Sequence, residues 1–470
     1  MDAHTSQILS GLPADLETSD RRALDLEGLL GRLAHKPVPV GRWQRFWILG
    51  TLQARIAAAY LAHWLRAGFA GADRREASLN EARLTAALQL LGGMGYLRGA
   101  VMKLGQTLAH WPEVAPVPFS EVLGLLHFEA PPMHFALLRE LVLDELGADP
   151  AELFAEFDTQ AFAAASLGQV HKARLQDGRA VAVKIQYPGM ARSIHADAEN
   201  FQLLMQPMRL GRHWANMMAM TEDIRAMLDL EMDYRHEAGL QDQARAVLAD
   251  ADDLVVPEVH HAVSTGRVLT SDLLEGVHLD AWLASGPGEA ERTRRAEQLL
   301  RASFRLWYSG SLVYADPHPG NYLFLPDGRL GLLDFGSVRR LSPEELAYSE
   351  QAGRCLDGQS DELDAFIARS TAVDSIGDLS PAHAAYVREF CDWVWEPLRH
   401  DGPFDFAGGG YFERGAALMG QVFRKRYTRS HPVNTWFNRN FFGVRALLHR
   451  MGARVDMRAI HLEERARADG

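Results

Sequence analysis

The chain has 470 residues, of which 47% are hydrophobic and 23% are charged, as is usual for a globular protein. Because a single core rarely grows to this length, we expect two lobes with additional segments. Its 49 Lys and Arg residues against 61 Asp and Glu residues give a net charge of −12 without a long basic run, which excludes a general nucleic-acid binder.

The N-terminal segment is polar and acidic, and it has neither the basic start nor the apolar stretch of a secretory signal. No run of apolar residues is long enough to span a membrane. From Trp43 to about Phe69, apolar residues at helical spacing are interleaved with arginines, which predicts an amphipathic helix. This helix can pack on its own protein or lie on a membrane surface. We therefore predict a cytoplasmic protein whose membrane contact, if it has any, is peripheral.

A second helical block is predicted over 86–109, and the paired prolines Pro131 and Pro132 follow it in a loop. We place a domain boundary near residue 150, where the character of the sequence changes. The predicted layout is an N-terminal region with the amphipathic helix (1–85), a helical extension (86–150), a small lobe (151–277) and a large lobe (278–470).

A β-hairpin is predicted after this boundary. Two short β-rich runs, Gly168–Arg174 and Arg179–Ile185, flank the turn residues Gln176–Gly178. Lys184 lies near the end of the second run, where a rigid strand can hold its ammonium group against phosphate oxygens. By itself this lysine could equally be an exposed strand residue.

Helical patterns return over about 190–248, and short strands are predicted at Leu254–Val256 and Val268–Thr270. From residue 289 helices dominate, except where two apolar runs flank the turn at Pro326–Gly328. The two cysteines lie 36 positions apart and outside any zinc-ligand spacing, so buried free thiols are expected at Cys355 and Cys391. These elements predict an α+β protein with a small mixed lobe and a helical large lobe.

The candidate chemistry lies in the segment ADPHPGN, where Asp316 and Asn321 are five positions apart. The prolines and the glycine of this segment force an irregular loop that can direct both side chains into one site. A carboxylate can orient or deprotonate an acceptor, and an amide oxygen can bind a metal ion. These are two of the functions that phosphoryl transfer requires.

Eighteen residues after Asp316, the sequence LLDFG places Asp334 directly after a predicted strand, as expected for a magnesium ligand. A helical glutamate normally positions the phosphate-binding lysine, and Glu237 is the candidate. Glu231 and Asp233 lie in the same segment and compete for this role, and all three could instead form a solvated acidic face.

Six motifs together resemble one family. They are KxGQ at 103–106, AAAS at 163–166, VAVKIQYPG at 181–189, ExDYxxEA at 231–238, ADPHPGN at 315–321 and LLDFG at 332–336. This combination is similar to the UbiB/AarF atypical kinases, which include the coenzyme Q biosynthesis kinases. The resemblance covers about 86–340, and a weaker likeness in FFGVRALLHRMGARVD extends it toward residue 456.

The resemblance implies a bilobal protein-kinase-like fold in which the helical extension lies over the site. Lys103 and Gln106 would face the nucleotide pocket, although KxGQ could also be an ordinary helix that Gly105 allows to pack closely. Glu231 and Asp233 would help to anchor the extension, and Lys184 would pair with Glu237. Asp316, Asn321 and Asp334 would take the catalytic and metal roles, with Mg²⁺ and ATP or ADP as ligands.

In this family an alanine-rich segment, here Ala163, Ala164, Ala165 and Ser166, replaces the glycine-rich phosphate loop of typical kinases. Alanine disfavours positive φ and adds a methyl group, so this backbone cannot wrap phosphates as freely as glycine. The resemblance implies an altered ADP/ATP preference and suppressed autophosphorylation.

The predicted function is an atypical kinase or ATPase that acts on a small or lipid-related acceptor, or that supports quinone or isoprenoid lipid metabolism. The alternative is a weakly catalytic module in which nucleotide controls the binding of a lipid or a protein partner. A small-molecule kinase of the antibiotic or choline type is a third class, but it would lack KxGQ. The chain departs from many family members at Leu126–Phe128 and at Leu240, which leaves open how the extension docks.

Overall fold

The structure is a computed structural model, and it describes residues 133–165, 167–189, 229–358, 360–408, 410–425, 431 and 433–469. The chain divides into two compact units. Residues 1–176 and 183–232 form unit 1, and residues 177–182 and 233–470 form unit 2. The amphipathic helix predicted at 43–69 and the helical block predicted at 86–109 lie outside the described residues.

The described part of unit 1 holds short helices and the strands of a small sheet. These elements are α7 (Phe135–Leu146), α8 (Pro150–Leu153), β1 (Glu156–Ala165), β2 (Gly168–Arg174) and most of β3 (Ala180–Gln186). Helix α7 ends at Gly147, whose φ of 74° suits a residue without a Cβ. Leu138 and Val142 lie one turn apart on α7 and are fully buried, so they form the packing stripe of this helix.

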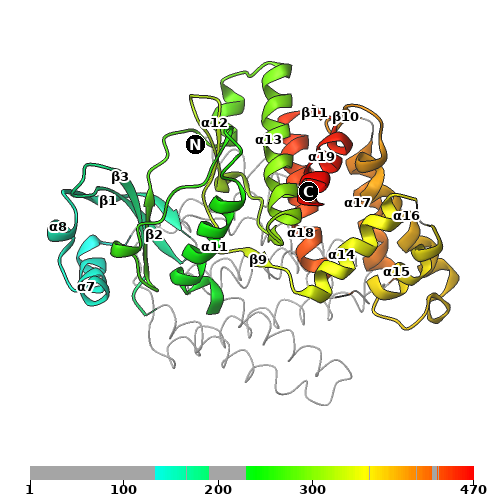
Figure 1. Cartoon of the computed structure of the whole chain (residues 1–470), viewed down its shortest axis with the longest axis horizontal. Coiled ribbons are helices and arrows are strands. Elements are labelled where there is room, and N and C mark those ends of the chain that lie inside the picture. Colours follow the sequence, from blue (N-terminus) through cyan, green and yellow to red (C-terminus); the bar gives the residue numbers. More distant parts are fainter. Residues whose placement is uncertain are drawn as a thin grey trace, which may run out of the picture. The chain divides into compact units, whose positions relative to one another are not determined.

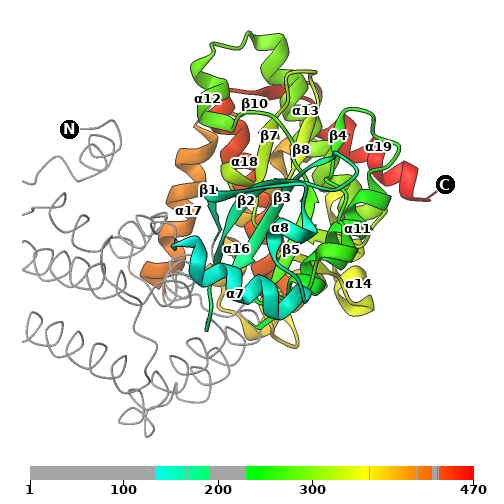
Figure 2. The same cartoon turned by 90° about the vertical axis from the view of Figure 1, so that its left-hand side faces the viewer.

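The strands β1, β2 and β3 lie side by side in this order (Figure 2). The strand β5 (Val268–Asp272) belongs to unit 2. Along β3, Val181, Val183 and Ile185 alternate with more exposed residues and are fully buried. A Cβ at Gly168 would lie 2.2 Å from Ile185 O, so only glycine permits this approach. The predicted hairpin is confirmed, with its second strand at Ala180–Gln186.

Unit 2 is mainly helical. Its described α-helices are α11 (Tyr234–Val247), α12 (Leu279–Ala284), α13 (Glu289–Tyr308), α14 (Pro343–Leu356), α15 (Leu363–Ser370), α16 (Pro381–Arg399), α17 (Tyr411–Lys425), α18 (Val433–Met451) and α19 (Met457–Asp469). Its further strands are β4 (Leu254–Val255), β6 (Leu312–Tyr314), β7 (Tyr322–Phe324), β8 (Leu330–Leu332), β9 (Val338–Arg340), β10 (Phe404–Asp405) and β11 (Arg454–Val455). They form one sheet of order β4-β8-β7 and the pairs β6-β9 and β10-β11. The strands predicted near 254 and 268 are thus present as β4 and β5.

Helix α13 is the centre of the large hydrophobic core, and it packs against α18 and α19 (Figure 1). Its residues Leu299, Phe304 and Leu306 are buried there. Arg305 and Glu464 are also buried, and two hydrogen bonds of 2.7 Å join the guanidinium group to the carboxylate. This pairing compensates the charges that both residues carry into the core.

The mixture of short sheets with many helices confirms the predicted α+β class. Within the described ranges, no helix combines the length and the apolar character that a membrane span needs. Cys355 and Cys391 are buried free thiols, as predicted. Burial raises the pKa of the Cys391 thiol to about 12, which keeps it protonated and unreactive at neutral pH.

Candidate functional site

An antiparallel strand pair brings the loop at 316–321 beside the loop at 334–336. Tyr322 of β7 lies opposite Leu332 of β8. One step further along the pair, Leu333 N donates a hydrogen bond of 3.0 Å to Asn321 O. Asn321 therefore lies across from the residue that immediately precedes Asp334.

A second antiparallel pair places Asp316 near the same segment. Tyr314 of β6 lies opposite Val338 of β9, and Ala315 N donates to Ser337 O over 3.4 Å. Asp316 is the next residue after Ala315. Because Ser337 directly follows the second loop, both ladders converge on the segment 334–336.

Hydrogen bonds within the first loop connect its two predicted functional residues. Asn321 Nδ2 donates to the backbone oxygen of Asp316 over 2.8 Å. This bond uses the amide nitrogen. The amide oxygen, which is the atom that can bind a metal ion, takes no part in it. His318 N also donates to Asp316 O over 2.7 Å, and Asn321 N donates to His318 O over 2.9 Å. Two donors of this loop, Asn321 Nδ2 and His318 N, thus share the carbonyl oxygen of Asp316.

Arg439 of α18 is a neighbour of Asp316 that the sequence reasoning missed. Its Nη2 lies 3.9 Å from Asp316 Oδ1, and its side chain is only 18% exposed. A partly buried guanidinium group at this distance can help to orient the Asp316 carboxylate. Arg439 lies two positions before the stretch FFGVRALLHRMGARVD. The weak resemblance of this stretch to the UbiB/AarF family was the feature of the sequence that could have drawn attention to Arg439.

Glu237 approaches the second loop from α11. It lies in the first turn of this helix and is only 3% exposed. A Cβ at Gly336 would lie 3.4 Å from Glu237 Oε2 and 3.3 Å from Asp334 Oδ1, and Gly336 N donates to Asp334 Oδ1 over 2.9 Å. Carboxylate oxygens of Glu237 and Asp334 therefore both lie beside this one glycine. The burial of Glu237 excludes the alternative that it belongs to a solvated acidic face.

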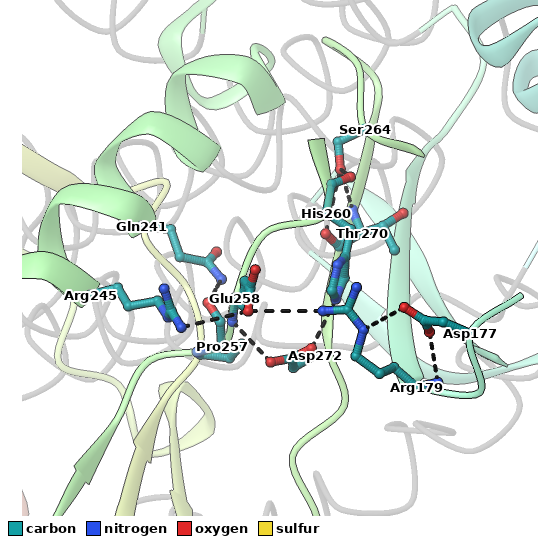
Figure 3. Close-up of polar contacts among 10 residues, drawn as sticks. All are labelled: Asp177, Arg179, Gln241, Arg245, Pro257, Glu258, His260, Ser264, Thr270 and Asp272. Atoms are coloured by element: carbon teal, nitrogen blue, oxygen red, sulfur yellow. Dashed lines mark hydrogen bonds and ion pairs between the residues drawn. The ribbon is translucent and has the colours of Figure 1, made fainter. Parts of the chain in front are cut away.

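Polar contacts fix the helix that carries Glu237. One turn after Glu237, the buried Gln241 side chain donates to Pro257 O over 2.8 Å. Glu258 lies next in the chain, and its carboxylate is 3.6 Å from Arg245 Nη2 of the same helix and 4.0 Å from Arg179 Nη1 (Figure 3). The ion pairs are exposed and contribute little, so the buried Gln241 contact is the firmer anchor.

The other two acidic candidates of this segment occupy different environments. Asp233 is the N-cap of α11, where its Oδ1 accepts a hydrogen bond of 3.0 Å from Arg235 N. Tyr234 N donates to Gly266 O over 3.0 Å and fixes the start of the helix. Glu231 precedes this start and is half-buried. Their predicted role of anchoring the helical extension stays a prediction, because that extension lies outside the described residues.

The remaining candidates belong to unit 1 or lie outside the described part of the chain. Lys184 is on β3, and the alternation of the strand places it on the face opposite to the buried valines. Residues 163–165 end β1 and pair with residues 168–170 of β2, so this alanine-rich segment is the last part of a hairpin strand. Ser166, Lys103 and Gln106 are not among the described residues.

The oxygen donors in unit 2 fit magnesium. Mg²⁺ is usually held by one or two carboxylates together with phosphate oxygens and water. The Asp334 carboxylate and the Asn321 amide oxygen are hard donors of this kind. In the described ranges, no group of three or more His, Cys, Asp or Glu side chains could hold a metal ion. A magnesium ion at Asp334 and Asn321 would therefore need further oxygen ligands from a bound phosphate or from water.

The tyrosines beside these loops are poor acid or base candidates. Burial raises the pKa of Tyr314 well above its usual value, and the negative charges of neighbouring groups add to this. Burial likewise raises the pKa of Tyr322. Both phenols stay protonated at neutral pH, so the carboxylates are the better candidates for proton transfer.

Comparison with known families and proteins gives a consistent result. Residues 125–356 match the ABC1 atypical kinase-like domain. The uncharacterized Synechocystis protein sll0005 is 32% identical over 259 residues, which are 55% of this chain and 38% of that protein. AarF domain-containing protein kinase 1 of Xenopus laevis is 29% identical over 254 residues, 54% of this chain and 49% of its own length. The chain thus spans about half the length, or less, of these curated relatives.

Two further matches extend over more of the chain. The rat protein named atypical kinase COQ8B, mitochondrial, is 29% identical over 444 residues, which are 92% of this chain and 81% of that protein. The structure of Mycobacterium tuberculosis Rv3197 in complex with erythromycin has a TM-score of 0.57 and 27% identity, and the match covers 84% of this chain and 98% of that one. Together with the domain match, this confirms the predicted kinase-like α+β fold.

Proposed function

Since the chain belongs to the UbiB/AarF family of ABC1 atypical kinase-like proteins, we propose that it binds a magnesium–nucleotide complex as an atypical kinase or ATPase. It would hydrolyse the nucleotide or transfer its terminal phosphoryl group to a small or lipid-related acceptor. One observation carries this proposal: two strand pairs bring Asp316, Asn321 and Asp334 into one region of unit 2.

Each of these residues has a distinct role in the proposal. Asp334 and Asn321 would hold Mg²⁺, which when bound neutralises charge on the phosphates. The Asp316 carboxylate, beside Arg439, would orient the acceptor and take its proton. Phosphoryl transfer requires little covalent chemistry from the protein. Orienting the acceptor is therefore the main contribution expected of Asp316.

The other predicted residues would complete the nucleotide site. Lys184 would bind phosphate oxygens and pair with Glu237, whose burial suits an ion pair with a fixed geometry. Lys103 and Gln106 would face the same nucleotide. The segment 163–166 would cover the phosphates with alanines and a serine, which supports an unusual preference between ADP and ATP.

The acceptor class is proposed from the relatives. The rat relative carries the name of a mitochondrial atypical kinase, COQ8B, and this supports a link to quinone lipid metabolism. A peripheral membrane contact would then bring the site to its acceptor. Rv3197 was solved in complex with erythromycin, and this supports a second candidate, a weakly catalytic module in which nucleotide controls the binding of a lipid or a partner.

A nucleotide panel tests the proposal. Thermal shift and turnover are measured with ATP, ADP and GTP, each with and without Mg²⁺, and the panel is repeated with anionic liposomes. We expect stabilisation by a nucleotide only when Mg²⁺ is present, because a ligand that binds the native state raises the melting temperature. Stimulation of turnover by liposomes would support a lipid-related acceptor. Absence of any magnesium-dependent nucleotide effect would contradict the proposed function.

A further inference from the structure

Helix α18 contacts the catalytic loop although it lies far outside the matched kinase-like domain, which ends at residue 356. Asn440 is buried in this helix, with 4% of its surface exposed. Its Nδ2 donates a hydrogen bond of 2.7 Å to Tyr314 O. Ser303 Oγ of α13 donates to Asn440 Oδ1 over 3.1 Å. Both ends of the amide are therefore used, and its orientation is fixed.

The carbonyl group that Asn440 holds belongs to the last residue of β6, two positions before Asp316. The ring of the same residue, Tyr314, packs edge-on against Phe335 at 5.9 Å between ring centroids. Phe335 follows Asp334 directly in the chain. The backbone that leads into Asp316 is thus held between α18 on one side and the second loop on the other.

Gly443 lies one turn after Asn440 on the same face of α18. A Cβ there would lie 2.2 Å from Pro317 Cγ and 3.0 Å from Pro317 Cδ. The proline ring is part of the loop backbone and has little freedom to move away. Gly443 therefore lets the helix approach the loop, and any side chain in its place would push Pro317 outward.

We propose that α18 positions the catalytic loop, with Asn440 and Gly443 as positioning residues for Asp316. This inference rests on the proposed function, since it concerns the geometry of that reaction. Neither residue touches the nucleotide or the acceptor in this account. Both act by fixing the backbone at 314–317, and a displacement of about 1 Å at a catalytic group can slow a reaction by about 10²-fold.

Asn440→Ala tests this inference, with Asn434→Ala as the matched control. Asn434 is an asparagine on the same helix, but its side chain contacts Tyr348 Oη at 2.6 Å and Ser370 O at 3.0 Å, away from the loop. We expect Asn440→Ala to lower kcat by about 10- to 10²-fold with an unchanged KM for Mg-nucleotide. Asn434→Ala should change kcat less than twofold. Equal kcat values for the two variants at matched folded fractions would overturn the inference.

Gly443→Ala supplies an independent test, with Gly420→Ala as its control. Gly420 lies in α17, and no described atom comes within 4 Å of the position a Cβ would take there. We expect Gly443→Ala to lower kcat by about 10-fold or more, since Pro317 must move, and Gly420→Ala to leave it unchanged. A full kcat in a folded Gly443→Ala variant would contradict the positioning role.

Hydrogen exchange separates this inference from the proposed function. In Asn440→Ala we expect the peptide 314–323 to exchange at least about 10-fold faster than in the parent chain, because the bond to Tyr314 O is lost. In Asn434→Ala this peptide should exchange as in the parent. Unchanged exchange in Asn440→Ala would overturn the inference even if nucleotide turnover is measured. Failure of the parent chain to bind Mg-nucleotide would instead overturn the proposed function, while the exchange result still decides whether α18 holds the loop.

Discussion

The α13–α19 interface and the two loops at 316–321 and 334–336 both hold ionisable groups, which are buried at the interface and partly exposed in the loops, and they make different contacts. At the interface, Glu464 is fully buried and meets Arg305 through two hydrogen bonds of 2.7 Å. In the loops, Asp334 Oδ1 accepts a hydrogen bond from Gly336 N, and Arg439 Nη2 lies 3.9 Å from Asp316 Oδ1. Matched charges hold helices in place, whereas carboxylates oriented by backbone contacts can still bind a metal ion or take a proton.

Replacing a loop carboxylate should therefore change turnover, and replacing an interface charge should change stability. The largest effect is expected for Asp334→Asn. An amide in place of this carboxylate removes the negative charge that would hold magnesium, so magnesium-dependent turnover should fall below detection. Turnover is followed as phosphate release under saturating Mg-ATP, and melting temperature serves as the folding control. Full turnover in this variant would remove Asp334 from the site.

Asp316→Asn should give the next effect, a fall in turnover of about 10²- to 10⁴-fold, the usual range for a positioned acid or base. Nucleotide binding should be largely kept, since this residue is proposed to act on the acceptor. Calorimetric titration with Mg-ATP measures the affinity and steady-state kinetics measures kcat. A loss of affinity that accounts for the whole loss of kcat/KM would indicate that Asp316 binds the nucleotide instead.

At the interface, Glu464→Ala should lower the free energy of unfolding by about 3 kcal/mol, because Arg305 loses its buried countercharge and keeps the half-exposed Asp250 carboxylate, 3.0 Å from its Nη1. Glu463→Ala is the matched control. Glu463 is 60% exposed and lies 3.3 Å from Arg301, so its loss should cost less than about 1 kcal/mol. Denaturant unfolding compares the two variants, and turnover at low temperature should be equal. Similar stabilities would show that the buried pair contributes no more than a surface pair.

The smallest expected effect is a change in pH dependence at the same interface. Burial lowers the pKa of His461 to about 4, and its Nδ1 lies 2.8 Å from the Tyr308 hydroxyl. Between pH 6.5 and 4 the unfolded chain binds a proton that the folded chain does not, so this histidine lowers the free energy of unfolding as the pH falls. From pH 7 to pH 5 the loss amounts to about 2 kcal/mol. His461→Gln should abolish this part of the pH dependence. Denaturant unfolding at pH 7 and pH 5 measures it, and the same loss of unfolding free energy in the variant as in the parent would contradict the prediction.

Local patterns made parts of both regions predictable from the sequence. The alternation in Val181–Lys184 and the turn before it gave the hairpin, and the order of Asp316, Asn321 and Asp334 gave the candidate site. Asn440 and Arg439 could not be found in this way, because more than 100 residues separate them from the loop they contact. Glu464 looked like one more charge in a polar terminal helix, since its partner Arg305 lies 159 positions earlier. Pairings at such distances depend on tertiary packing, and no local periodicity records them.

We propose that Lys184 binds the same magnesium-bound polyphosphate as Asp316 and Asp334. The most direct measurement is labelling with an acyl-phosphate derivative of ATP, which acylates a lysine beside the bound phosphates, followed by peptide mass spectrometry. The chain has only five lysines, and Lys172 on the neighbouring strand β2 is an internal control. We predict that Lys184 is labelled, that excess Mg-ATP prevents this, and that Asp334→Asn loses the protected labelling. Equal labelling of Lys172 and Lys184 without protection by Mg-ATP would contradict the account.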